Sequence, residues 1–398
     1  MSYDHVITGA GVIGSAAAYH LKRIDPGSEI LLIDMGSRPG EGNTARSAAL
    51  YRNIFSSRTS KLLSASSISY YRELGHEVQL NPMGYLWMFS RDQWGRSKSS
   101  IETLDPERDE VDFPGREEIS DMLRIDPDGI GSFPGIHRGI KGRMCGSLSG
   151  MGLAQHYADR FKELGGELLF DSRVERIELG GSVINGKRAR SLILESGERI
   201  MGEDFLFATG AWTHDLLSGI GIFTGVLPKK RQLFGIKLDD VEQITDRDSL
   251  PAMILPAGGV YIKPLLKGKM IFVGLADDLG RPYSLEDSDP EINFFRTDIE
   301  PVLNHYFPHL ADYELRSSWA GHYSNHWPDK NPVVENISNI YWSGGTSGSG
   351  IMKADAIGRI TADKLLGNGT SVLFDGSSFR VSDLSLRERD VEPESFVI

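Results

Sequence analysis

The chain has 398 residues, of which 40% are hydrophobic and 25% charged, and its formal net charge is −12. This composition predicts a globular protein with room for two cored domains, and the negative charge argues against nucleic acid or an anionic membrane surface as the main partner. The single cysteine, Cys145, excludes an internal disulfide, and no apolar run is long enough for a transmembrane helix. The first strand follows Met1 almost directly, which leaves no room for a signal peptide, so we expect a cytoplasmic protein.

A glycine motif between two short strands opens the chain. The order is strand, Gly9-Ala-Gly11-Val-Ile-Gly14, helix and strand, at residues 4–8, 9–14, 15–22 and 30–33. Gly9 allows a tight turn, Gly11 lets the backbone approach a pyrophosphate, and Gly14 lets the helix pack closely on the sheet. The helix N-terminus attracts phosphate, and Asp34, directly after the second strand, can accept hydrogen bonds from ribose hydroxyls. The pattern therefore predicts a site for an adenine dinucleotide.

The remaining elements follow in chain order. Hydrophobic periodicity predicts helices at 59–74, 117–123, 152–164, 289–307 and 351–366. It predicts strands at 84–89, 231–237, 259–263, 270–274 and 340–343, and a small meander at 168–170, 173–179, 190–194 and 200–207. The apolar stripe of 289–307 indicates core packing. Beyond Gly367 lies a polar tail, which we expect to wrap the surface or to join a subunit contact.

Three further blocks accompany the glycine motif. They are Gly42-Asn-Thr-Ala-Arg-Ser-Ala-Ala-Leu-Tyr-Arg52, Ala208-Thr-Gly-Ala-Trp212, and Trp319-Ala-Gly-His-Tyr-Ser-Asn-His-Trp-Pro-Asp-Lys-Asn-Pro332, which precedes a glycine cluster at 344–350. In this combination, over about residues 3–367, the chain resembles the D-amino-acid oxidase/sarcosine oxidase family of FAD-dependent amine oxidoreductases. The last block is the most specific, because simple NAD-dependent dehydrogenases lack a second glycine loop near the C-terminus.

The resemblance implies an α/β fold with an interleaved domain organisation. A Rossmann-like FAD-binding domain would comprise residues 1–80, 146–225 and 320–367. An antiparallel-sheet (α+β) substrate-binding domain would comprise residues 81–145 and 226–319, and residues 368–398 would form the C-terminal tail. The resemblance also implies an enzyme that removes hydride from the carbon next to nitrogen in an amino acid or N-methyl amino acid, such as sarcosine, dimethylglycine or proline, and delivers it to flavin N5.

The glycine cluster at 344–350 has a physical role in this scheme. The N1–C2=O edge of a flavin gains negative charge on reduction, and a second helix N-terminus at Ile351 can stabilise that charge. The resemblance extends the expected FAD contacts to Gly9, Gly11, Gly14, Asp34, Thr44, Arg46, Ser47, Val174, Gly210, Trp212, Gly348, Gly350, Ile351 and Met352. Relatives that attach flavin covalently use a cysteine seven residues before the Asp of a Pro-Asp pair; here that position is His322, so we expect non-covalent FAD.

The substrate site needs an anchor for a carboxylate and few acids, because the amine must be neutral when it gives up hydride. Residues 42–52 resemble the Gly/Ser/Arg loop of the family that lies along the flavin, and we call them the flavin loop. Arg52, at the end of this loop, is the first candidate anchor and Arg46 the second, since arginine forks carboxylates. Tyr261 and Lys263 share one face of a strand and could hold a carboxylate together, or could be a half-exposed strand with a snorkelling lysine. His322 lines the pocket, contacts the flavin edge, or is structural.

Two positions depart from sarcosine oxidases. The lysine that helps those enzymes reduce oxygen aligns with Phe272, and a second lysine aligns with Met352, with Lys353 one residue later. Both departures favour a dehydrogenase that passes electrons to an acceptor protein or quinone. A 2-hydroxy acid dehydrogenase and a flavin-binding assembly or scaffold protein without turnover stay open as alternatives, and so does a homo-oligomer.

Overall fold

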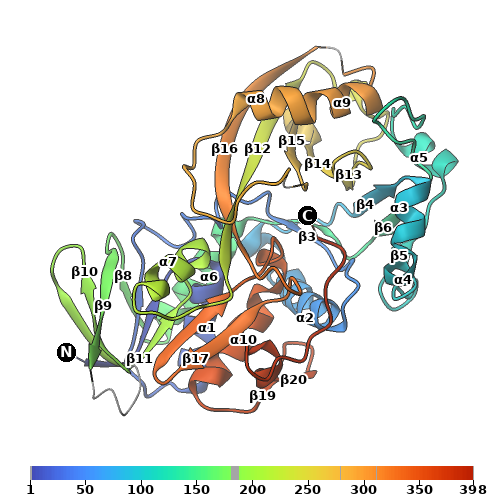
Figure 1. Ribbon diagram of the computed structural model, residues 1–398. Coiled ribbons are helices and arrows are strands. Elements are labelled where there is room, and N and C mark those ends of the chain that lie inside the picture. Colours follow the sequence, from blue (N-terminus) through green and yellow to red (C-terminus); the bar gives the residue numbers. More distant parts are fainter. Residues whose placement is uncertain (1, 181–187, 278, 311, 398) are drawn as a thin grey trace.

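The computed structural model describes residues 2–180, 188–277, 279–310 and 312–397. These residues form two lobes, each built on an eight-stranded sheet (Figure 1). The N-terminus lies at the far end of one lobe, whereas the C-terminus lies where the lobes meet. Among the helices that the structure describes, none is both long enough and apolar enough to cross a bilayer.

The first sheet is mainly parallel and carries the N-terminal motif. Its strands run in the order β17 (Val333–Ile337), β18 (Ile340–Gly344), β11 (Arg199–Phe207), β1 (Ser2–Thr8), β2 (Ile30–Ile33) and β8 (Glu167–Leu169), with β10 (Arg188–Leu194) on β11 and β9 (Val174–Gly180) on β10. All four residues of β2 are buried, as expected for a strand covered on both faces. This order places the carboxyl ends of β1 and β2 side by side, beside the glycine loop.

Four helices pack around this sheet and build the cofactor side of the molecule. They are α1 (Val12–Ile24), α2 (Arg58–Leu74), α6 (Gly150–Glu163) and α10 (Ala354–Leu365). The expected α/β fold is therefore confirmed, but one detail of the meander is wrong. The strand expected at 168–170 is β8, and it pairs in parallel with β2, because α6 carries the chain back over the sheet before it. Of the four strands expected in the meander, β9, β10 and β11 do pair antiparallel.

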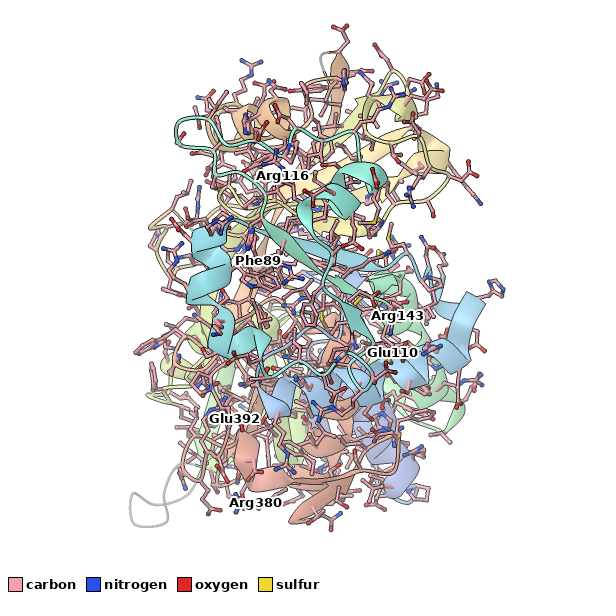
Figure 2. All side chains as sticks on the ribbon, turned by 90° about the vertical axis from the view of Figure 1, so that its right-hand side faces the viewer. Phe89, Glu110, Arg116, Arg143, Arg380 and Glu392 are labelled. Carbon is pink, nitrogen blue, oxygen red and sulfur yellow. The ribbon has the colours of Figure 1, made fainter. Side chains whose placement is uncertain are left out.

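The second sheet is largely antiparallel. Its order is β16 (Tyr313–Asn325), β12 (Leu227–Leu238), β15 (Met270–Leu275), β14 (Val260–Leu265), β13 (Ala252–Ile254), β4 (Tyr85–Phe89), β6 (Arg138–Gly142) and β5 (Val111–Asp112). Strand β16 continues in this sheet beyond residue 320, so it crosses the domain boundary that we propose from the sequence. Three smaller helices flank this sheet (Figure 2): α3 (Arg91–Arg96), α4 (Lys98–Ile101) and α5 (Arg116–Met122). Another short helix, α7 (Thr213–Ser218), belongs to the first lobe (Figure 1).

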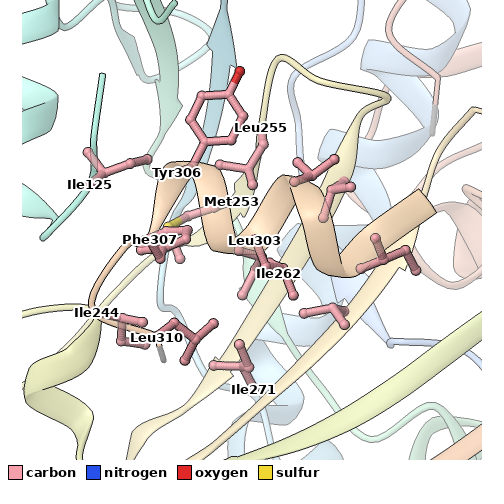
Figure 3. Close-up of a cluster of buried hydrophobic side chains, with 14 of the residues drawn as sticks. Ile125, Ile244, Met253, Leu255, Ile262, Ile271, Leu303, Tyr306, Phe307 and Leu310 are labelled. Atoms are coloured by element: carbon pink, nitrogen blue, oxygen red, sulfur yellow. The ribbon is translucent and has the colours of Figure 1, made fainter. Parts of the chain in front are cut away.

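One face of the second sheet forms a hydrophobic core (Figure 3). Met253, Ile262 and Ile271 on the strands pack against Leu303 and Phe307. The helix expected at 289–307 is shorter, and consists of α8 (Ile292–Phe294), a π-helical turn (Phe295–Ile299) and α9 (Glu300–Tyr306). Because side chains alternate along a strand, the neighbouring residues of the same strands point to the opposite face, toward the first lobe.

The tail is an integral part of the fold. After the hairpin β19 (Thr370–Val372) and β20 (Ser378–Arg380), it runs along the first lobe and ends at the junction with the second (Figures 1 and 2). The Arg389 guanidinium pairs with Asp329, and the Glu394 carboxylate accepts hydrogen bonds from the backbone N–H groups of residues 56 and 57. Phe396 is 2% exposed and packs near Trp87. The tail thus wraps the protein, which agrees with the first of the two expectations for it.

Candidate functional site

The glycine loop has the shape that a pyrophosphate needs. Gly9 has a φ of +103°, and a Cβ there would stand 2.5 Å from the carbonyl oxygen of Ala208. A Cβ on Gly14 would stand 1.8 Å from the Gly9 oxygen, so both glycines are required by close packing. Gly11 differs, because its φ of −66° suits any residue and the nearest atom to a Cβ there is the Thr44 hydroxyl at 3.4 Å. The space beside Gly11 is therefore left free by the protein.

The start of α1 also suits an anion. Its first turn holds no acidic residue, and its N-cap residue, Gly11, has no side chain to cap the free backbone N–H groups. The Thr44 hydroxyl accepts a hydrogen bond from the N–H of Val12 at 3.2 Å and so lies at this helix end, where we expect it. These features fit the adenine dinucleotide that the sequence predicts.

Asp34 lies at the end of β2, beside the glycine loop. Its carboxylate accepts hydrogen bonds from the backbone N–H groups of Ala10 at 2.6 Å and Gly36 at 2.7 Å. The segment that leads to Val174 reaches the same place, because the N–H of Ser172 donates to the Asp34 carbonyl at 3.0 Å. Gly210, with a φ of +58°, follows β11, and no atom lies within 4 Å of a Cβ built on it.

The second glycine cluster turns the chain from β18 toward α10. Gly348 has a φ of +83°, and a Cβ there would stand 2.6 Å from the ring of Tyr323. The helix begins three residues later than we predict, because residues 351–353 form a 3₁₀ turn and α10 starts at Ala354. Of the predicted contacts in this turn, Ile351 and Met352 are buried, and a Cβ on Gly350 would meet the Thr346 side chain.

Two adjoining cavities lie between the flavin loop and the second sheet, and they share Ser47, Ala48, Tyr261 and Tyr323 in their walls. The Arg52 cavity also includes Arg52, Tyr85, Gly348 and Met352. The Arg231 cavity also includes Asn43, Arg46, Arg231 and His322. In the described part of the chain, no aspartate or glutamate belongs to either wall. Three guanidinium groups without an acid make this site favourable for an anion.

Three tyrosines line the cavities: Tyr261 and Tyr323 belong to both walls, and Tyr85 belongs to the Arg52 cavity. The hydroxyls of Tyr261 and Tyr323 interact with each other, and among the described residues the buried hydroxyl of Tyr85 has no hydrogen-bond partner. Burial raises the pKa of all three hydroxyls, so they stay protonated at ordinary pH. They can therefore donate hydrogen bonds to a bound anion without adding negative charge to the site.

Arg52 lies deep in the site and is 3% exposed. Its guanidinium stacks on the rings of Phe55 and Trp87, at 4.1 and 5.4 Å from their centroids. Its terminal nitrogens donate to the carbonyls of Ile54 and Phe396, and Nε is buried without a partner. The tail thus holds Arg52 in place, a contact between residues 344 positions apart that the sequence could not indicate.

Arg46 and Lys263 are tied to neighbours. Arg46 donates to the Ser288 hydroxyl at 3.0 Å, and the Lys263 ammonium donates to the Ala48 carbonyl at 2.7 Å. Burial lowers the pKa of Lys263 to about 8. Lys263 lines neither cavity, whereas Tyr261 lines both, so the structure does not bring this predicted pair together in the cavity walls.

His322 contacts residues from three elements. Its ring centroid lies 6.4 Å from that of Trp212, its Nε2 accepts a hydrogen bond from the N–H of Glu286 at 3.2 Å, and its backbone N–H donates to Asn43 at 2.8 Å. Burial and the nearby Lys230 lower the pKa of His322, so the imidazole is neutral at pH 7. Two predicted residues are therefore in contact: His322 lines the Arg231 cavity, and Trp212 packs against its ring.

The sequence reasoning missed several residues of the cavity walls, and four of them matter for the chemistry: Asn43, Tyr85, Arg231 and Tyr323. Tyr85 and Arg231 lie on strands that were predicted, but periodicity alone does not say which face of a strand meets the cofactor domain. Asn43 belongs to the flavin loop. Met352 lines the Arg52 cavity, whereas Lys353 points away from it, with its Nζ 2.9 Å from the Ser60 hydroxyl and burial lowering its pKa to about 7.

Comparisons with known proteins agree with this architecture. A protein from Xenopus laevis named FAD-dependent oxidoreductase domain-containing protein 1 is 23% identical over 93% of this chain and 80% of its own. A glycine oxidase from Pseudomonas aeruginosa is 25% identical over 92% of this chain and 96% of its own. Among solved structures, an L-proline dehydrogenase from P. horikoshii has a TM-score of 0.77 at 21% identity, over 92% of this chain and 94% of its own. Glycine oxidase from Geobacillus kaustophilus has a TM-score of 0.77 at 18% identity, over 98% of this chain and 99% of its own.

The family model described as FAD dependent oxidoreductase (DAO) matches residues 4–364. This span contains both sheets, the two glycine loops and both cavities, and the shape of the first glycine loop fits the dinucleotide part of FAD. Its members are enzymes, and the resemblance expected from the sequence is confirmed. The chain belongs to the DAO family of FAD-dependent oxidoreductases.

Proposed function

We propose that this enzyme oxidises the C–N bond of an amino acid or N-methyl amino acid, with the substrate carboxylate at Arg52. The observation that carries this proposal is the acid-free site lined by arginine and tyrosine at the junction of the flavin loop and the second sheet. The names of the similar structures, a proline dehydrogenase and glycine oxidases, support the substrate class. FAD, when bound, would accept the two electrons that leave the substrate.

The side chains of the site would control the charge of the substrate. A carboxylate at Arg52 would receive further hydrogen bonds from the hydroxyls of Tyr85 and Tyr261. Without an acid in the walls, nothing stabilises the ammonium form of the amine, and the surrounding guanidinium groups favour its neutral form. The neutral amine has the free electron pair that assists loss of hydride from the adjacent carbon.

The test is anaerobic mixing of the FAD-loaded protein with matched amines and 2-hydroxy acids, including sarcosine, dimethylglycine and proline in both chiral forms. Loss of the long-wavelength flavin absorbance with amines supports the proposal. Bleaching only by 2-hydroxy acids would replace it with the hydroxy-acid alternative. An unchanged spectrum with every compound would favour a flavin-binding scaffold.

We expect the cofactor to be held without a covalent bond. Cys145 is 0% exposed, lines neither cavity and has a pKa raised to about 12 by burial, so it cannot replace the cysteine that relatives use. Precipitation of the purified protein with acid should therefore release the yellow colour into the supernatant. Colour that stays in the washed pellet would contradict this expectation, and its disappearance in a His322→Ala variant would identify the attached residue.

We also expect slow transfer of electrons to oxygen, in favour of an acceptor protein or quinone. The Phe272 ring packs edge-on against Trp319 at 5.2 Å, where oxidases have a lysine whose charge stabilises the negative charge that develops on oxygen. Lys263 lies opposite Phe272 on the neighbouring strand, but its amine is bonded to Ala48. With substrate, peroxide should form more slowly than an artificial dye is reduced.

The matched variant for this comparison is Lys263→Met. Equal rates of peroxide formation and dye reduction in the wild type would reject the dehydrogenase assignment. If the variant then lost only the peroxide rate, Lys263 would be the cation that serves oxygen in place of the missing lysine.

A further inference from the structure

Among the residues that the structure describes, Arg231 is a cation without an acidic partner. Its terminal nitrogens meet only backbone carbonyls, those of Lys230 at 3.4 Å and Ala276 at 3.2 Å, and its Nε is buried with no hydrogen bond. The guanidinium lies over the ring of Tyr323, 5.3 Å from its centroid, in the wall of the Arg231 cavity. Within the described residues, no carboxylate forms an ion pair with Arg231.

The neighbouring cations behave differently. Lys230 pairs with Asp287 at 2.7 Å and with Glu291 at 3.2 Å, and Arg281 pairs with Glu291 at 2.5 Å. Acidic side chains are therefore available one residue away, on the other face of β12, but the alternation of the strand keeps Arg231 away from them. A partly buried guanidinium that lacks a carboxylate is costly unless a ligand supplies one.

Arg231 and Arg52 form two cationic ends of one site. Arg52 belongs to one cavity and Arg231 to the other, and both cavities share Tyr261 and Tyr323. The Arg231 guanidinium lies over the ring of Tyr323, and Arg52 shares the wall of its cavity with the same tyrosine, so both cations border the shared region. A substrate with a single carboxylate would satisfy only one of these ends.

We propose that the natural substrate is an amino acid with two carboxylates, one bound by Arg52 and the second, on its side chain or on its N-substituent, bound by Arg231. This inference rests on the proposed function for its reaction but makes a separate statement about binding. Arginine suits the role because its planar donors match a carboxylate and its charge is permanent. The length of the substrate would then decide which amine carbon faces the flavin.

The binding test uses unreactive acids, so it does not depend on turnover. Succinate and butyrate have the same carbon chain length and differ by one carboxylate, and their affinities are measured from the perturbation of the flavin spectrum of the holoenzyme. We expect succinate to bind at least about 10-fold more tightly, because a charged pair at a partly buried site adds affinity. Arg231→Ala should bring the ratio of the two affinities close to one, and Arg231→Lys should restore part of it.

Two variants control this experiment. Lys237→Ala removes an exposed cation on the same strand, away from the site, and should leave the ratio as in the wild type. Arg231→Gln keeps a donor for the Ala276 carbonyl, and it replaces Arg231→Ala in the binding measurement if that variant does not fold. Equal binding of succinate and butyrate by the wild type, or loss of FAD from both Arg231→Ala and Arg231→Gln, would overturn the inference.

Turnover separates this inference from the proposed function. Under anaerobic conditions, iminodiacetate should reduce the flavin faster than sarcosine, or aspartate faster than alanine. Arg231→Ala should remove that preference. Succinate selectivity without reduction by any amine would overturn the proposed function alone. If sarcosine or alanine reduces the flavin as fast as its dicarboxylate counterpart, only the inference that Arg231 binds a second carboxylate would be overturned.

Discussion

Gly11→Val should give a folded protein that no longer binds FAD. The backbone at Gly11 suits a valine, and only the Thr44 hydroxyl lies near the new Cβ, at 3.4 Å, so the apoprotein should tolerate the change. The added methyl groups would occupy the space that the pyrophosphate needs beside the N-terminus of α1. The measurement is the FAD content of the purified variant, together with its circular dichroism and thermal unfolding.

Two further glycine variants make this test specific. Gly95→Val changes an exposed glycine in α3 that has no atom within 4 Å of its Cβ position, and it should keep wild-type FAD content. Gly14→Ala should lower stability itself, because its Cβ would stand 1.8 Å from a backbone oxygen. Wild-type FAD content in folded Gly11→Val would show that the motif does not bind the pyrophosphate.

Arg52→Ala should lower kcat/KM by a factor that corresponds to about 2–4 kcal/mol of transition-state stabilisation, because a charge-assisted pair is lost and the substrate anion is left without its partner. The interaction is present in both the ground state and the transition state, so most of the loss should appear in KM. Arg52→Lys should recover only part. A lysine cannot hold the Ile54 carbonyl, the Phe396 carbonyl and a carboxylate from separate directions, as the guanidinium can.

The contact with the tail requires a control of its own. Phe396→Ala removes the buried ring but keeps both Arg52 and the carbonyl that it binds, so it reports what loosening of the tail alone does to kinetics. If Arg52→Ala loses its FAD, Arg52 belongs to the cofactor site. If neither Arg52 variant changes kinetics, the anchor lies elsewhere, and Tyr261 with Lys263 is the next pair to replace.

Local sequence was sufficient to predict the glycine loop, the helix and the strands around the N-terminal motif. The glycine motif, its helix and Asp34 lie within 34 consecutive residues, and each is specified by short-range geometry: a positive φ at Gly9, close packing at Gly14 and free space at Gly11. Four strands of the second sheet, β4, β12, β14 and β15, were likewise predicted from the sequence, whereas β5, β6, β13 and β16 were not. What failed were details that depend on neighbours far along the chain, such as the parallel pairing of β8 and the late start of α10.

The substrate side was decided by tertiary structure. Alternation divides a strand into two faces, but only the packing of α8 and α9 on one face leaves the other, with Tyr261 and Arg231, for the site. Arg231 and Lys230 are adjacent in sequence, yet one is paired with acids and the other faces the cavity. Arg52 depends on a carbonyl from the end of the tail. Such contacts join segments hundreds of residues apart, and no local pattern encodes them, because they exist only once both lobes have folded together.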